Sequence, residues 1–487
     1  MKELVVPFGT IWLELAGEKI DFEVIDVTKQ FNQSVGPHER ISGEVVLVPR
    51  ILLGRQEGVL QLKGDFELES TTGPNDEPSV GGWFSHGYYL EMGACSHDEC
   101  MENFVQGSHG FPAYQLGSSK PQVILFQLSY KKQAEVDLQN ADFSLTNALE
   151  MMSKVLGRRT SIANCILGGA LGDALGYPIE FDNLAAIDEK YGNTGITFGN
   201  FVGQPLASDD TQMTLFTASG LLLAGDDKLS NVWQAYQDWL DTQFKANLSE
   251  LSHEPVSWLV DQPEMFASRE PGRTCLFTIM RNQAGTLKEP INDSKGCGGV
   301  MRVAPFGLLT NDSSLAEVAR LGAETSALTH GHQMSSLASA FVAVLVRLEM
   351  RFVTSLKQNI TEALAVVRKT FADYEELAAF TELVEQAESL AENSRTDSEN
   401  LRELGEGWVA EETVVIALYC ALRYQTQPLK AIEVAVNHQG DSDSTGSLAG
   451  QIVGLCQTDT NWWPKKFVEK LDLSEVIFTM VDRILTK

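Results

Sequence analysis

Two short acidic segments, far apart in the sequence, combine carboxylates with hydroxyl groups. They are residues 208–211 (SDDT) and residues 441–445 (DSDST). An apolar pattern with helical spacing directly follows each, so each can form the first turn of a helix, where the helix dipole favours negative charge. A serine or aspartate before a helix is also the ordinary N-cap signature, so either segment alone fits a cap without chemistry.

The two segments together permit metal chemistry. If both helix starts meet in space, four carboxylates face one another: Asp209, Asp210, Asp441 and Asp443. Like charges a few Å apart do not all stay ionised without a counter-ion. Two divalent cations roughly 3.5–4 Å apart would neutralise them and leave positions open for water and substrate. Oxygen ligands suit Mg²⁺, with Mn²⁺ as the alternative, whereas Zn²⁺ favours nitrogen and sulfur.

Four motifs resemble those of the ADP-ribosylglycohydrolase family and occur in the family's order. They are residues 168–181 (GGALGDALGYPIEF), 208–211, 296–305 (GCGGVMRVAP) and 437–446 (NHQGDSDSTG). The resemblance covers roughly residues 158–487 and leaves the first part of the chain unmatched. It implies an all-α domain there and a hydrolase that removes ADP-ribose from modified protein.

The resemblance also implies ligands for two Mg²⁺ ions, all of them oxygen donors from the two acidic segments. These are Ser208, Asp209 and Asp210 from the first segment and Asp441, Asp443 and Ser444 from the second. The family often has threonine where Ser208 and Ser444 stand, and serine keeps the hydroxyl. A divalent cation lowers the pKa of a bound water, and Asp210 or Asp443 would accept its proton.

Other motif residues would contact the ligand. The resemblance implies that Glu180 gates the metal site and contacts its water, although a solvated cap is the alternative. It also implies that the glycine-rich loop wraps the ADP-ribose. Glycines let the backbone approach a ligand, and amides at a helix start can hold an anion. By itself such a run fits a tight turn. The loop candidates are Ser294, Lys295, Gly296, Cys297 and Gly298.

Three further residues complete the candidates. The family places a histidine near the position of His330 against the ligand, whereas a histidine near a helix start is usually a capping or packing residue. Trp408 would border the pocket or be a buried tryptophan. Arg302 is interpreted as structural, with a buried carboxylate as a possible partner.

Helices must position these motifs, because the apolar period is 3.6 from residue ~158 onward. Residues 162–174 place many small side chains on one face, which predicts a central helix that packs close to its neighbours. Residues ~241–295 are irregular and rich in proline, as is typical of a substrate-side insertion. Helical patterns also occupy 215–223, 232–240, 334–352, 361–404, 414–423, 429–436 and 462–485.

Residues 1–130 follow a different pattern of short alternating runs separated by glycine and proline. They predict an antiparallel β sandwich or barrel, and residues 131–157 predict a linker that becomes helical. Roughly a dozen more acidic than basic residues lie in 1–130, so this domain either is solvated or docks a basic protein. Its histidines predict no catalytic site: His38, His86, His97 and His109.

Composition excludes several classes of function. The chain has 487 residues and a net charge of −29, and it lacks the basic clusters that nucleic-acid binding requires. It contains neither a run of ~18 apolar residues nor a signal-peptide pattern, so no membrane span is expected. Seven cysteines, an odd number, predict free thiols in a reducing cytoplasm. A zinc site at Cys95, His97 and Cys100 is less favoured, since it lacks a fourth ligand.

Three functions remain open. The first is a metal-dependent hydrolase acting on ADP-ribosylated protein, with the arginine linkage favoured. The second is a binding protein: an immunity factor that occludes an ADP-ribosyltransferase toxin through the acidic N-terminal domain. Both roles can coexist. The third is an inactive relative, which the intact carboxylates of both acidic segments argue against.

Overall fold

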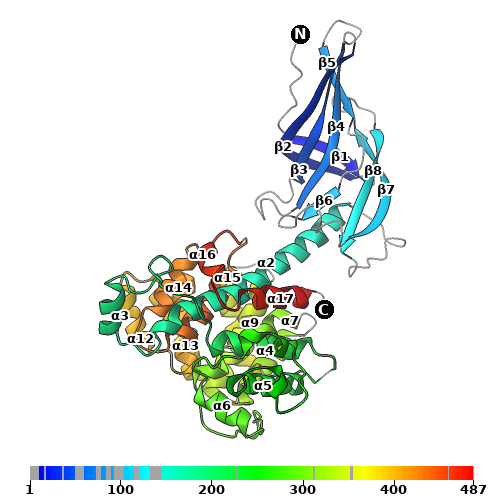
Figure 1. Ribbon diagram of the computed structural model, residues 1–487. Helices are drawn as coiled ribbons and strands as arrows, with labels where there is room; N and C mark the ends of the chain where they lie inside the picture. Colours follow the sequence, from blue (N-terminus) through cyan, green and yellow to red (C-terminus); the bar gives the residue numbers. More distant parts are fainter. Residues whose placement is uncertain are drawn as a thin grey trace. The chain divides into compact units, whose positions relative to one another are not determined.

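The computed structural model (Figure 1) divides the chain into two compact units, Met1–Gly157 and Arg158–Lys487. In the first unit it describes the backbone of residues 10–15, 18–35, 38–49, 60–72, 78–83, 89–92, 104–114, 121–131 and 145–157. In the second it describes residues 158–485 except 226, 311–312, 351–354 and 459, with side chains from Arg159 onward. We describe each unit by itself.

The described parts of the first unit are antiparallel strands and the start of α2. The strands are β1 (Thr10–Leu15), β2 (Glu18–Val35), β3 (His38–Pro49), β4 (Leu60–Thr72), β5 (Pro78–Trp83), β6 (Tyr89–Met92), β7 (Phe104–Tyr114) and β8 (Pro121–Lys131). One sheet has the order β1-β2-β3-β4-β5 with β6 also paired to β4, and β7 pairs with β8. The sandwich or barrel predicted for residues 1–130 stays a prediction.

Several predictions for this unit lie outside the described residues. They concern His86, Cys95, His97 and Cys100, and also residues 132–144 of the linker. Residues 145–157, the helical end of that linker, belong to α2. In the part of the chain whose side chains are described, five cysteines are free thiols, as expected: Cys165, Cys275, Cys297, Cys420 and Cys456.

The second unit is all-α over its described residues. Its longer helices are α2 (Leu145–Gly176), α4 (Asp209–Leu222), α5 (Lys228–Phe244), α8 (Leu315–Ala327), α9 (Gln333–Glu349), α10 (Leu356–Thr370), α11 (Leu377–Glu392), α13 (Ala410–Arg423), α15 (Ser442–Leu455) and α17 (Ser474–Leu485). Its shorter ones are α3 (Leu184–Tyr191), α6 (Arg273–Met280), α7 (Ala304–Leu309), α12 (Asp397–Leu404), α14 (Pro428–Val436) and α16 (Lys465–Val468). No helix in the described residues combines the length and apolarity that a membrane crossing needs.

The buried centre of this unit consists of helices without a solvent-exposed face. Helices α4, α9, α13 and α15 are buried along nearly their whole length. The predicted insertion at 241–295 begins within the last turn of α5, and after Phe244 its helices are α6 and short 3₁₀ turns, among them η5 (Pro263–Met265). The single tail helix predicted at 462–485 is instead divided into α16 and α17.

Helices α2 and α15 cross with their backbones in contact. A Cβ atom added at Gly172 would lie 1.9 Å from the carbonyl oxygen of Gly446, and one at Gly450 would lie 2.0 Å from that of Gly168. The contacting pairs recur every four residues along both helices, because this spacing keeps them on one helical face. This agrees with the close-packed central helix expected from residues 162–174, and it brings the end of α2 to the start of α15.

Candidate metal centre

The first acidic segment starts α4 and is anchored by α2. The backbone N–H of Ser208 donates to both carboxylate oxygens of Asp173 at 3.0 Å. Thr211 donates to Asp173 through its backbone N–H at 3.1 Å and through its hydroxyl. The hydroxyl of Ser208 accepts the N–H of Asp210 at 3.2 Å, so Ser208 is also the N-cap.

Asp173 is a site residue that the sequence analysis did not select. Its side chain is fully buried and fixes the first turn of α4 from a neighbouring helix. A signal was present, because Asp173 is the single charged residue among the small and apolar residues 160–179. A buried carboxylate requires partners, and these prove to be the N–H groups of the first acidic segment.

The second acidic segment starts α15 in a similar way. The carboxylate of Asp441 accepts the N–H of Ser444 at 3.3 Å and caps the helix. The backbone N–H of Asp441 donates to the carbonyl oxygen of Glu406 at 2.8 Å. Gly440 permits this contact, since its φ is +128° and an added Cβ would lie 2.0 Å from that same oxygen. The loop before α13 therefore holds Asp441 in place.

The structure brings the two segments together. The hydroxyl of Ser444 donates to Oδ2 of Asp210 at 3.2 Å across a sequence separation of 234 residues. The side chain of Ser208 also lies beside the carboxylate of Asp443 and opposes the rise in its pKa that burial causes. Both segments therefore cap their own helices and also face each other, so the cap and metal interpretations are compatible.

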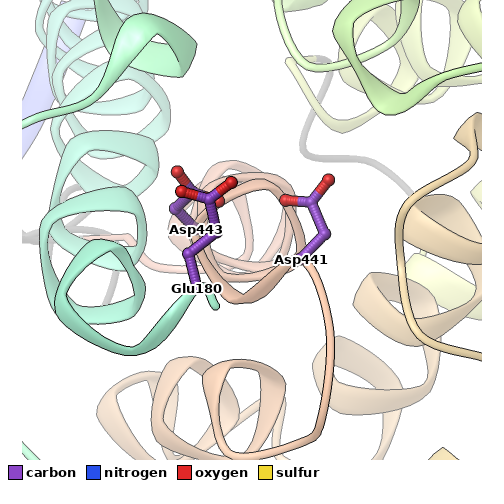
Figure 2. A group of neighbouring side chains, drawn as sticks. All are labelled: Glu180, Asp441 and Asp443. Carbon is purple, nitrogen blue, oxygen red and sulfur yellow. The ribbon is translucent and has the colours of Figure 1, made fainter. Parts of the chain in front are cut away.

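Glu180 completes the group from the end of α2. Glu180, Asp441 and Asp443 each offer a carboxylate oxygen, and these oxygens lie within 4.8 Å of one another (Figure 2). Glu180 is only 8% exposed, so the alternative of a solvated cap is wrong. In the described part of the chain, Oε2 of Glu180 and Oδ1 of Asp210 are buried without a hydrogen-bond partner. We call these residues the acidic cluster: Asp173, Glu180, Asp209, Asp210, Asp441 and Asp443.

The electrostatics of the acidic cluster favour either bound protons or a bound cation. Burial raises the pKa of Asp209, Asp210 and Asp441 well above the usual range for a carboxylate. Burial and the charge of Asp443 raise the pKa of Asp173 to about 7 and that of Glu180 to about 10. Among the described residues, no ion pair includes a member of the cluster. Unpartnered, buried oxygen donors are what a hard divalent cation binds.

The glycine-rich loop lies against the second acidic segment. It contains the 3₁₀ turn η6 (Cys297–Gly299), whose first N–H donates to the carbonyl oxygen of Trp408 at 3.2 Å. The thiol of Cys297 lies beside the side chains of Asp441 and Ser444. Burial, and then the charge of Asp441, raise the pKa of this thiol well above its usual range, so it stays protonated. Gly296 and Cys297 therefore adjoin the acidic cluster.

The remaining loop candidates have protein partners. The ammonium of Lys295 is paired with Glu411, which lies in the first turn of α13 and is 4% exposed. The hydroxyl of Ser294 is 3.1 Å from that of Thr274. The loop thus joins the insertion at 241–295 to the start of α13.

His330 lies beneath the glycine-rich loop. It is 1% exposed, and a Cβ added at Gly298 would lie 3.3 Å from its ring and 2.8 Å from the sulfur of Cys275. Burial and the charge of Arg302 lower its pKa to about 3, so the imidazole is neutral. This placement favours the packing interpretation, in which His330 supports the loop from the buried side.

Two expectations need correction. Arg302 is buried, but its partners are Thr329, the carbonyl oxygen of Thr325 and the ring of Tyr236, so the expected carboxylate partner is wrong. Trp408 is 39% exposed, so the alternative of a buried tryptophan is wrong as well. Its ring stacks on that of Phe181, which directly follows Glu180, with a centroid distance of 6.0 Å. An exposed aromatic pair therefore stands beside the acidic cluster.

The profile of the ADP-ribosylglycohydrolase family matches residues 154–487. An uncharacterized protein of Archaeoglobus fulgidus is 26% identical over 294 residues, which are 60% of this chain and 86% of that protein. ADP-ribosylhydrolase ARH3 of Bos taurus is 25% identical over 219 residues, and that of Homo sapiens is 26% identical over 220.

The chain covers only part of these hydrolases. Each alignment includes 40% of this chain and 59% of the ARH3 protein. One solved chain belongs to an "ADP-ribosylglycohydrolase-related protein complex"; it is 21% identical, with a TM-score of 0.42, and the match covers 67% of this chain and 98% of that one.

Proposed function

Because the chain belongs to the ADP-ribosylglycohydrolase family, we propose that it is a metal-dependent hydrolase that removes ADP-ribose from modified protein, with the arginine linkage preferred. One observation carries this proposal. Carboxylates from the end of α2 and the starts of α4 and α15 meet in a buried cluster without a neutralising base among the described residues.

Two Mg²⁺ ions, or Mn²⁺ in their place, are the cofactors that these residues fit. The proposed ligands are oxygen donors of the two acidic segments: Ser208, Asp209, Asp210, Asp441, Asp443 and Ser444. The orphaned Oδ1 of Asp210 supports this assignment, since a buried carboxylate oxygen without a partner is costly. When bound, such ions supply an activated water and orient the ribose.

The protein groups have separate tasks in this proposal. Asp210 or Asp443 accepts the proton of the attacking water, because both lie inside the cluster. Glu180 stands where the cluster meets Phe181 and Trp408 and controls access to it. The backbone of Gly296, Cys297 and Gly298 faces the ADP-ribose, while Ser294, Lys295 and His330 hold that loop in shape.

A release assay tests the proposal. Protein ADP-ribosylated on arginine, and separately on serine, is incubated with the full chain and Mg²⁺, and free ADP-ribose is measured. We expect release by the intact protein and none by Asp209→Ala/Asp441→Ala. If the intact protein releases nothing from either linkage, with Mg²⁺ or Mn²⁺, the chain is not this hydrolase.

A second function is proposed for the first unit. Residues 1–130 form an acidic β-rich domain, residues 131–157 connect it, and residues 158–487 form the hydrolase domain. The excess of acidic residues in 1–130 favours a basic protein partner, and an ADP-ribosyltransferase toxin that this domain occludes is the candidate. The chain would then serve as an immunity protein, by occlusion alone or together with hydrolysis.

A further inference from the structure

The segment of residues 269–272 forms the rim of the acidic cluster on the side of the insertion. It is tied twice to the first acidic segment, since Asp209 donates its N–H to the carbonyl oxygen of Arg269 at 3.3 Å and Gly272 donates its N–H to Oδ2 of Asp209 at 3.0 Å. The guanidinium of Arg269 pairs with Asp472 at 3.0 Å, and Asp472 also accepts the N–H of Ala207 at 3.0 Å. The hydrogen bonds to the first acidic segment therefore fix the position of this rim.

Glu270 lies between the two tethers. Its φ is +51°, a left-handed conformation that is uncommon for residues other than glycine, asparagine and aspartate. Its side chain is exposed, whereas the neighbouring charge of Arg269 is already matched by Asp472. Glu270 therefore adds a negative charge to the rim.

Glu270 lies close enough to the end of α2 for its charge to raise the pKa of two residues there. They are Glu180 and Tyr177, whose phenol is half-buried. Oε2 of Glu180 is buried and has no hydrogen-bond partner among the described residues, so it is available to a donor from a ligand. Two carboxylates and one aromatic ring thus lie near one another at this rim.

From this arrangement we infer that Glu270 recognises the guanidinium of an ADP-ribosylated arginine and sets the preference for that linkage. A guanidinium is planar and always charged, donates two parallel hydrogen bonds to a carboxylate and packs on aromatic rings. A serine acceptor has no charge and gains nothing from Glu270. The inference rests on the proposed hydrolase function and adds the acceptor side of the site to it.

The test compares two linkages and two matched variants in the full chain. Glu270→Gln removes the charge at the rim, and Glu264→Gln removes an exposed charge in η5 of the same insertion. Steady-state release is measured with one peptide ADP-ribosylated on arginine and another ADP-ribosylated on serine. For the arginine-linked peptide we expect Glu270→Gln to raise KM about fivefold with kcat nearly unchanged, the scale of one partly exposed ion pair.

The controls separate a loss of guanidinium recognition from a general effect of charge and from misfolding. Glu264→Gln and the serine-linked peptide should change less than about twofold, given the size of exposed charge effects. Glu270→Gly, which also relieves the left-handed backbone, should reproduce the loss and shows that misfolding is not its cause. Equal effects on both linkages, or release from serine alone, overturn the inference but leave the hydrolase intact. No release from either linkage rejects the hydrolase and this inference with it.

Discussion

Asp443 is the residue on which the acidic cluster depends most. Its charge raises the pKa of four carboxyl groups, and in each case only burial raises that pKa more. The four groups are Asp173, Glu180, Asp210 and Asp441. Its own side chain accepts the N–H of Ser444 at 2.9 Å, a bond that an asparagine oxygen can replace. The charge at this position can therefore be removed while the capping geometry is kept.

We predict that Asp443→Asn lowers kcat by about 10²- to 10⁴-fold, the usual effect of losing a general base. The same change should stabilise the metal-free protein by about 1 kcal/mol, since one buried like charge is gone. Release assays and thermal unfolding in EDTA measure the two effects. Asp188→Asn on exposed α3 is the control. A destabilised metal-free variant would contradict the role given to this charge.

Lys295 tests whether a loop candidate has a structural role. Its ammonium is partly exposed, but its partner Glu411 is 4% exposed and has a second oxygen, Oε2, without a hydrogen-bond partner among the described residues. We predict that Lys295→Met destabilises the protein by about 1–2 kcal/mol, less than for a fully buried pair because solvent screens the lysine.

The double variant Lys295→Met/Glu411→Gln should recover most of that loss, since no buried carboxylate is then left unpaired. Urea unfolding of the single and double variants measures this coupling. If Lys295→Met leaves stability unchanged and only raises KM, Lys295 is a ligand contact and not a support of the loop.

At the scale of elements, the crossing of α2 and α15 decides whether the cluster exists. Gly176 of α2 also contacts the backbone of α15, where an added Cβ would lie 2.3 Å from the carbonyl oxygen of Ser442. Two helices that touch through glycines leave no room for adjustment by side-chain rotation, because backbone atoms fill the contact. The separation between Glu180 and Asp443 follows from this crossing.

We therefore predict that Gly172→Ala destabilises the protein by about 1–3 kcal/mol, the usual cost of overpacking, and weakens Mg²⁺ binding at least about tenfold because the helices move apart. Thermal unfolding and calorimetric titration with Mg²⁺ measure these effects. Gly199→Ala is the matched control, since its added Cβ would meet only Thr197 at 3.7 Å. Equal behaviour of the two variants would show that the crossing tolerates a methyl group.

At the scale of the molecule, the cluster links stability to pH and to metal. Glu180 holds its proton in the folded protein up to a pKa of about 10, whereas the unfolded chain releases it near the ordinary value. A pKa raised by folding gives stability at low pH that is lost as the pH rises. His330, with a lowered pKa, has the opposite dependence, but only below its ordinary pKa of about 6.5.

In EDTA we therefore expect stability to fall between pH 7 and pH 9, by about 1 kcal/mol per pH unit from Glu180 alone. Mg²⁺ should raise Tm at pH 8 and weaken the dependence of stability on pH, because the bound cation neutralises the carboxylates in place of protons. Differential scanning fluorimetry across this range, with and without Mg²⁺, measures both effects. A Tm that is constant in EDTA and insensitive to Mg²⁺ would exclude a buried cation site.

The division into two units leads to a prediction about which unit carries the hydrolase activity. All residues of the acidic cluster lie between 173 and 443, in the second unit. We expect a chain that begins at Leu145, the first residue of α2, to hydrolyse a small ADP-ribosyl-arginine substrate within about twofold of the full chain. The shortened chain should protect cells less well against an ADP-ribosyltransferase toxin. Equal protection would remove the docking role of residues 1–130.

The sequence by itself determined that the second unit is helical, and it indicated which residues are candidates for the chemistry. Hydroxyl and carboxylate pairs before apolar runs predict helix starts, and small residues at helical spacing in 162–174 predict a close crossing, because both signals act over a few residues of local backbone. Only the tertiary structure decided that Asp173 anchors α4, that Arg302 lacks a carboxylate partner and that Glu270 stands on the rim. These facts depend on which distant surfaces meet, as in the bond from Ser444 to Asp210 across 234 residues, and no local pattern encodes such a meeting.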